Sequence, residues 1–334
     1  MKPLDSAINA LVEILEVVEG ERLLVVADGE KEGIADVFAE AGLKLGLWVR
    51  RIILEDTREY RREVPDFLRE AIVNSRPNVA LNLLRGVAEE VSFRISLIKM
   101  ETGRAGARLG HCPGITMDML TEGALALTKK EYKEMKEMAA LLLSTLSGVK
   151  EVVVSNPEGT DFRLLVKDRE FFTDVWLDEK LKPWLNLPVG EVIVAPLETK
   201  GEGVIVAEAA GGIGRVEWIK LEFSNGRVSL ISSSEKEVEE RVKKILKTDS
   251  QASLLGEFAI GLNKKARLVP EFLESEKIYG TIHVAFGNNS SFPGGRNRSR
   301  IHLDFLVIEP TVDIVYEDGN RLRILEHGDI VLPQ

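Results

Sequence analysis

Two short hydrophobic stretches near the C-terminus each carry a histidine. Read as a strand, "RSRIHLDFLV" places His302 and Asp304 on one face and three apolar side chains on the other. In "TIHVAFG", His283 faces away from its apolar neighbours in the same way. The linker "GNNSSFPGGRNRS", rich in Gly and Asn, predicts that the two strands pair as a hairpin. Two imidazoles and a carboxylate would then share one face, and these donors suit Zn, Co, Mn or Fe.

Two glutamates are candidates to complete this set of donors. Glu191 opens the apolar run "EVIVAP", and Glu257 lies inside "LLGEFAIG"; both directly follow a glycine. Burying an unpaired carboxylate costs several kcal/mol, so a glutamate in such a run needs a cation, a hydrogen-bond partner or water. Either glutamate alone would be expected to face water. The two remaining histidines, His111 in "GHCPG" and His327 in "EHGD", are expected to lie in solvent-facing turns.

The first part of the chain alternates between helical and strand patterns. This rhythm predicts an α/β N-terminal domain, residues 1–149, with an open, mostly parallel sheet. The loop "ADGEKEG" after the first strand lacks the glycine pattern of a dinucleotide-binding turn, which argues against nucleotide binding there. The helices are expected at 8–18, 33–46, 87–100 and 128–147, and the strands at 22–28, 47–54 and 78–84.

Short apolar runs separated by turn residues dominate from residue 150 onward. They predict a mainly antiparallel β (α+β) metal-binding domain, residues 150–334, with one helix at 234–248. The glycine-rich "AAGGIG" follows a strand and leads into another strand, so a hairpin turn is favoured over a phosphate-binding loop.

Composition restricts the class of protein. The 334 residues carry a net charge of −10, which argues against nucleic acid as a partner, because phosphate binding needs a basic face. One cysteine, Cys112, excludes an internal disulfide and a cysteine-rich zinc site. The N-terminal segment resembles an amphipathic helix with acidic residues rather than a signal peptide, and no apolar run approaches the ~20 residues of a membrane span. We therefore expect a cytoplasmic protein without a membrane partner.

Several longer stretches resemble a known family. "NLPVGEVIVAP", "LLGEFAIGLN", "EKIYGTIHVAFGNN" and "NRSRIHLDF", with "GARLGHCPGITMDML" and "NPEGTDFRLLV", are similar to stretches of the thermophilic metallo-aminopeptidases of the aminopeptidase T and S type. The resemblance implies a hydrolase, usually a homodimer, that removes N-terminal residues from peptides with a free N-terminus. It also implies two divalent metal ions (Zn, Co or Mn) that activate a water molecule. The ligands would fall on Glu191, Glu257, His283, His302 and Asp304, and no proton-shuttling residue can be named.

Two departures from this family leave other functions open. The peptidases have a tyrosine ligand a few residues after the first histidine, where "GNNSSF" offers Ser290, and their loop between the histidines is longer. The same superfamily contains mononuclear iron dioxygenases that open hydroxypyridine rings with two histidines and an aspartate. His283, His302 and Asp304 could supply that set. A non-catalytic protein with the same fold is a third hypothesis.

Overall fold

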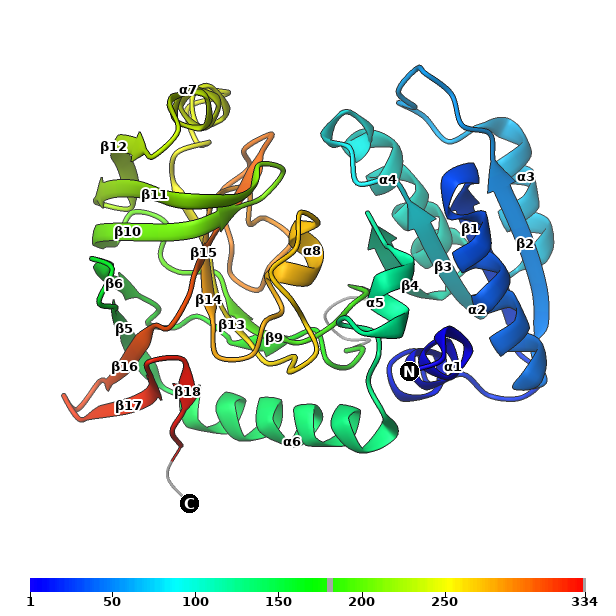
Figure 1. Cartoon of the computed structure of the whole chain (residues 1–334), viewed down its shortest axis with the longest axis horizontal. Helices are drawn as coiled ribbons and strands as arrows, with labels where there is room; N and C mark the ends of the chain where they lie inside the picture. Colours follow the sequence, from blue (N-terminus) through cyan, green and yellow to red (C-terminus); the bar gives the residue numbers. More distant parts are fainter. Residues whose placement is uncertain (179–182, 333–334) are drawn as a thin grey trace. The chain divides into compact units, whose positions relative to one another are not determined.

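The computed structural model describes residues 1–178 and 183–332, and the chain divides into two compact units. The first comprises Met1–Lys136 and Asp174–Val189, and the second comprises Glu137–Thr173 and Gly190–Gln334 (Figure 1). The sequence patterns did not predict that residues 174–189 belong with the first unit, and the domain boundary at residue 149 stays a prediction. Within the described residues, no helix is long and apolar enough to cross a membrane.

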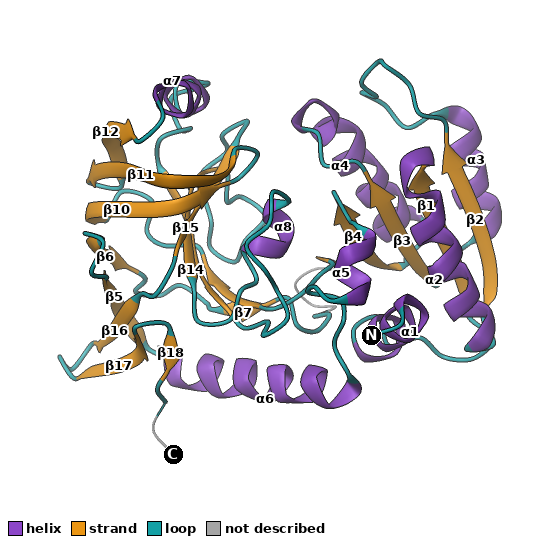
Figure 2. Ribbon diagram, viewed as in Figure 1, coloured by secondary structure: helices purple, strands orange, loops and turns teal. Residues whose placement is uncertain are grey.

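The first unit is built on an open five-stranded sheet whose strands all run parallel, as the alternating pattern predicted (Figure 2). The strand order is β2-β1-β3-β4-β8. Its elements are α1 (Pro3–Glu13), β1 (Arg22–Asp28), α2 (Glu32–Lys44), β2 (Trp48–Leu54), α3 (Asp66–Ser75), β3 (Val79–Leu84), α4 (Val91–Lys99), β4 (Arg108–Pro113), α5 (Met117–Thr121) and β8 (Trp184–Asn186). The strands β4 and β8 and the helices α3 and α5 were not among the elements predicted from the sequence.

Helices cover both faces of this sheet. On one face, Leu24 and Val26 of β1 pack in a buried cluster with side chains of α3 and α4. On the other face, Gly42 of α2 lies so close to Leu23 of β1 that a Cβ atom at Gly42 would come within 2.8 Å of it. A strand buried on both faces needs a continuous apolar run, which explains the sequence "RLLVVA" of β1.

Charged side chains fill the edge of this sheet beyond the ends of β1 and β3. From β1 the chain continues to β2 on one side of the sheet and then to β3 on the other side, so the direction of strand addition reverses between β1 and β3. α/β sheets commonly bind ligands at such a point. Here Asp28, at the end of β1, accepts a hydrogen bond from the Arg85 amide (2.6 Å) and pairs with Arg61 (2.5 Å). Glu90 is fully buried and pairs with both Arg61 and Arg85. Residues of the chain itself thus occupy this position with an ion-pair cluster.

The second unit contains a large, mainly antiparallel sheet that curls on itself, as the second half of the sequence predicted. The helix α6 (Lys129–Leu146) leads into it. The strand order of the sheet is β18-β17-β16-β5-β6-β10-β15-β14-β13-β9-β7, with β11 and β12 added beside β10. The strands are β5 (Val149–Ser155), β6 (Asp161–Leu165), β7 (Phe172–Thr173), β9 (Glu191–Val194), β10 (Gly201–Ala210), β11 (Gly214–Ser224), β12 (Arg227–Ser233), β13 (Leu255–Gly261), β14 (Ile282–Gly287), β15 (His302–Val307), β16 (Thr311–Tyr316), β17 (Arg321–Glu326) and β18 (Asp329–Ile330), and the helices are α7 (Lys236–Ile245) and α8 (Phe272–Ser275).

An aromatic core supports the strands that carry the candidate site. Phe286 of β14 and Phe305 of β15 lie edge to face with ring centroids 6.1 Å apart, and Phe223 of β11 contacts Phe286 at 5.7 Å. Both hairpins predicted from the sequence are confirmed. The "AAGGIG" segment connects β10 to β11, and β14 pairs antiparallel with β15.

Candidate metal centre

Four neighbouring strands bring the five predicted residues onto one face of the curled sheet. The strands β9, β13, β14 and β15 are adjacent and antiparallel, and residues paired across such strands point to the same side. The pairs that define this face are Glu191 with Gly261, His283 with Ala259 and Leu306, Ala285 with Glu257 and Asp304, and His302 with Gly287. The alternation of side chains along each strand therefore places all five polar residues together.

A β-bulge sets the position of Glu257. The register between β13 and β14 shifts between Leu255 and Glu257, and Gly256 is the additional residue. A Cβ atom at position 256 would lie 2.8 Å from the carbonyl oxygen of Gly287, so the close approach of the two strands requires glycine here. The glycine that precedes Glu257 in the sequence thus lets its strand pack closely against β14.

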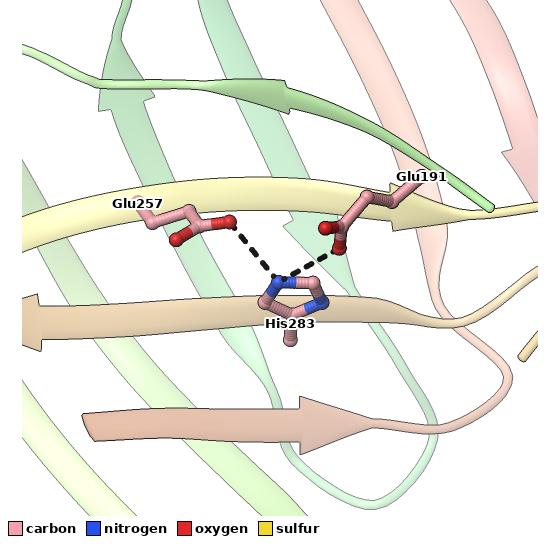
Figure 3. Close-up of side chains that lie close together, drawn as sticks. All are labelled: Glu191, Glu257 and His283. Atoms are coloured by element: carbon pink, nitrogen blue, oxygen red, sulfur yellow. Dashed lines mark hydrogen bonds and ion pairs between the residues drawn. The ribbon is translucent and has the colours of Figure 1, made fainter. Parts of the chain in front are cut away.

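Glu257 lies between the two histidines. Its Oε1 is 3.2 Å from Nε2 of His283, and its Oε2 is 2.9 Å from Nε2 of His302. The same His283 nitrogen is 3.4 Å from Oε2 of Glu191, and Figure 3 shows both carboxylates directed at it. On the other side, Nε2 of His302 is 3.0 Å from Oδ1 of Asp304. The two oxygens of one carboxylate therefore face two separate imidazole nitrogens.

Contacts outside the cluster orient His302. Its Nδ1 lies 2.7 Å from the carbonyl oxygen of Asn288, and this bond requires the proton to be on Nδ1. The Nε2 atom is then the one that faces the carboxylates. The ring of Phe292 lies edge to face against His302, with centroids 6.1 Å apart. A metal-binding imidazole is commonly oriented by such a bond from its second nitrogen to a carbonyl group.

Two further charged residues, Glu276 and Lys277, reach the same face from the turn that follows α8. A carboxylate oxygen of Glu276 lies within 4.8 Å of ligand atoms of His283 and Asp304. Lys277 is fully buried, and its ammonium contacts Glu191 closely and Glu276 at 2.9 Å. The sequence reasoning singled out neither residue, because a turn carries no periodic pattern that would show where its side chains point.

The electrostatics of the cluster reflect its burial and its charges. Burial opposes protonation of His283, but its hydrogen bond to the Glu257 carboxylate and the charge of Glu191 outweigh burial and raise the pKa of His283 to about 9. Partial burial also opposes protonation of His302, but the Asp304 carboxylate raises its pKa well above the ordinary value. Burial would raise the pKa of Glu257, but the two histidines lower it below the ordinary value. Raised pKa values favour the protonated form of both imidazoles, so they add positive charge beside the Lys277 ammonium.

The cluster offers donors that suit a divalent transition metal. Three groups of three residues each bring their ligand atoms within 4.8 Å of one another: Glu191, Glu257 and His283; Glu257, His302 and Asp304; and Glu276, His283 and Asp304. Imidazole nitrogens and carboxylate oxygens are ligands of Zn, Co and Mn. The donor set therefore fits a metal centre.

Comparison with known proteins assigns the family. A model of the thermophilic metalloprotease family (M29) matches residues 123–330, which is more than half of the chain. The chain belongs to the thermophilic metalloprotease family M29. The resemblance found in the sequence is thus confirmed, and members of this family are metal-dependent hydrolases of peptides. No curated protein matches the chain.

Two solved structures share the fold of this M29 protein. AmpT from Thermus thermophilus is 20% identical, with a TM-score of 0.72 and coverage of 99% of both chains. The 2,5-dihydroxypyridine dioxygenase from Pseudomonas putida KT2440 is 16% identical, with a TM-score of 0.71 and coverage of 99% of this chain and 97% of the dioxygenase. At these identities the likeness concerns the fold alone, and it is nearly the same for both proteins.

The expectation for one of the other two histidines is wrong. His111 does not lie in a solvent-facing turn: it lies in β4, is 5% exposed, and contacts Trp184 of β8 edge to face. Burial, with a smaller effect from the charge of Arg94, lowers its pKa to about 3. His327 lies in the turn between β17 and β18 and is exposed, as predicted.

Proposed function

We propose that this M29 protein is an aminopeptidase that holds two divalent metal ions in the cluster around Glu257. Glu191, Glu257 and His283 would hold one ion, and Glu257, His302 and Asp304 the other. The observation that carries this proposal is the position of Glu257, whose two oxygens face different histidines. A carboxylate in that position is suited to bridge two cations.

The residues of the cluster define what the site can do. Bound divalent ions would lower the pKa of a water molecule toward neutrality and polarise the carbonyl group of a peptide bond. Glu191 and Asp304 supply negative charge on either side of Glu257, and the carbonyl group of Asn288 keeps His302 in the orientation for binding. His283 and Glu257 are buried, whereas the side chain of His302 is 31% exposed, so solvent reaches the cluster from the His302 side and we expect substrate to enter there.

Metal content tests this proposal directly. Elemental analysis of the purified protein should give about two ions per chain. Because Glu257 belongs to both groups, Glu257→Gln should remove most of both ions, whereas Glu191→Gln should remove about one. Glutamine is close to glutamate in shape, so packing should change little while the charge is lost. Glu202→Gln, an exposed change on β10, is the matched control, since among the described residues its carboxylate pairs with Arg163.

A pair of substrates tests the aminopeptidase activity. The wild type should hydrolyse an aminoacyl-anilide and leave the N-acetylated anilide intact, because the proposed substrate is a peptide with a free N-terminus. One iron per chain, together with consumption of dioxygen in the presence of an aromatic diol, would instead support a ring-cleaving dioxygenase. A homodimer and a cytoplasmic location remain predictions from the sequence and its resemblance to the peptidases. A heat-adapted source is a further prediction, which the abundance of Glu, Lys and Arg beside a single Cys favours.

A further inference from the structure

Lys277 is placed beside the proposed metal ligands by close backbone packing. Its carbonyl oxygen accepts a hydrogen bond from the Asn263 amide (2.8 Å), just beyond the end of β13. At Gly261, the last residue of β13, a Cβ atom would lie 2.0 Å from the carbonyl oxygen of Ile278. Since Gly261 pairs with Glu191 across the sheet, the turn that carries Lys277 is fixed next to Glu191.

The ammonium group of Lys277 contacts two carboxylates. It binds Oε1 of Glu191 and lies 2.9 Å from Oε1 of Glu276. The other oxygen of Glu191, Oε2, is the one that faces His283. Lys277 thus determines which oxygen of Glu191 is directed toward the proposed metal position, and it adds one positive charge to that half of the cluster.

The two halves of the cluster differ in the positive charge beside their carboxylates. The half formed by Glu257, His302 and Asp304 has no lysine or arginine within 4.0 Å of its carboxylates among the described residues. The half formed by Glu191, Glu257 and His283 has the Lys277 ammonium in direct contact with one of its ligands. A positive charge in contact with a ligand of this half lowers its affinity for a metal ion, and the low local dielectric strengthens the effect.

We propose that Lys277 is a positioning residue that acts as a resident cation of the centre. It holds the Glu191 and Glu276 carboxylates together before metal binds, and it makes the site of Glu191, Glu257 and His283 the weaker of the two metal sites. In this proposal Glu276 balances part of the Lys277 charge, and the metal ions are held by Glu191, Glu257, His283, His302 and Asp304. This inference rests on the proposed two-metal function and adds the order in which the sites fill.

Titration of the metal-free protein with Mn²⁺, followed by calorimetry and by thermal unfolding, tests this role without measuring activity. The wild type should show a tight and a weak site. Lys277→Met should tighten the weak site by about tenfold or more, since one opposing charge is removed. It should also lower the melting temperature of the metal-free protein, and Mn²⁺ should restore most of that loss.

Two further variants form a series in net charge. Glu276→Gln removes one negative charge and should weaken the Mn²⁺ site, whereas the double variant with Glu276→Gln and Lys277→Met keeps the net charge and should bind nearly as the wild type does. If Lys277→Met alone does not fold, the expected order of Mn²⁺ affinity, with the double variant above Glu276→Gln, still tests the inference. Lys243→Met is the control and should leave both sites unchanged, since Lys243 pairs with Glu239 and Glu240 in the part of the chain that the structure describes.

The outcomes separate this inference from the proposed function. If the wild type binds two Mn²⁺ ions and Lys277→Met leaves the weak site unchanged or weaker, the inference is wrong while the two-metal proposal stands. If both variants that carry Glu276→Gln lose an ion, Glu276 is a ligand and the inference is again wrong. If the wild type binds a single ion or none, the two-metal proposal itself fails.

Discussion

Replacing Glu90 with glutamine is expected to destabilise the first unit strongly. Glu90 is fully buried beyond the ends of β1 and β3, where it accepts three hydrogen bonds from Arg61, at 2.9, 3.1 and 2.9 Å, and one from Arg85. Glu90→Gln keeps the size of the side chain but removes its charge. It leaves two guanidinium groups with Asp28 as their remaining carboxylate in this cluster.

The pKa of Glu90 gives the size of the effect. Burial would raise this pKa, but the hydrogen bonds from Arg85 and Arg61 outweigh burial and lower it from 4.5 to about 2. Such a shift corresponds to about 3 kcal/mol of unfolding free energy, and removing one partner of a buried ion pair costs about 3–5 kcal/mol. Because the folded pKa is depressed, this stability is present above pH 4.5 and is lost as the pH falls toward 2.

Denaturant unfolding, followed by hydrogen exchange at the amides of β1 and β3, reports the first unit separately. At neutral pH, Glu90→Gln should lower its unfolding free energy by about 3 kcal/mol, and the difference from the wild type should shrink as the pH falls from about 4.5 toward 2. Glu89→Gln, the exposed neighbour, should change it by less than about 0.5 kcal/mol. A Glu90→Gln protein as stable as this control, with an unchanged acid response, would refute the reasoning.

Three further predictions concern other parts of the molecule. Burial raises the pKa of Glu101 to about 8, so this side chain is the neutral acid in the folded protein below that pH. The unfolding free energy should therefore fall as the pH rises from 4.5 to about 8, and Glu101→Gln should flatten this part of its pH profile. Gly203→Ala should destabilise the protein by about 2 kcal/mol or more, because the φ of Gly203 is +132° and a Cβ atom there would lie 2.2 Å from a carbonyl oxygen of β6. In α2, a Cβ atom at Gly33 would meet nothing within 4 Å, so Gly33→Ala should not destabilise the protein. Thermal unfolding of the two variants compares these effects. His302→Ala and Asp304→Ala should each remove bound metal with little change in the circular dichroism spectrum, and a variant with full metal content would contradict the assignment.

Local periodicity predicted much of the candidate centre. In a strand, successive side chains point to opposite faces, so the sequence alone placed His302 with Asp304 and separated them from Leu303 and Phe305. The linker between the histidine strands predicted their hairpin, and pairing then brought His283 to the same face. Turn chemistry predicted the β10–β11 hairpin for the same reason, since both signals depend only on residues close together in the sequence.

Only the tertiary structure brought in the residues that lie outside such patterns. Lys277 and Glu276 reach the centre because a turn packs against Gly261, and nothing in their own sequence context indicates that contact. The burial of His111 depends on β8, a strand from a distant part of the chain that pairs with β4 and covers it. Whether a polar side chain faces water or a buried partner is set by the segments that pack on it.

The ion-pair cluster of the first unit shows the same difference between what the sequence determines and what the folded chain determines. The apolar run of β1 predicted a strand buried on both faces, and therefore a parallel sheet with helices on each side. The sequence could not show that Asp28, Arg61, Arg85 and Glu90, from three separate segments, meet beyond that sheet. Periodicity determines which face of an element is buried, because it follows from the geometry of one strand or helix. The partners of a buried charge depend on the packing of several elements, and that packing exists only in the folded chain.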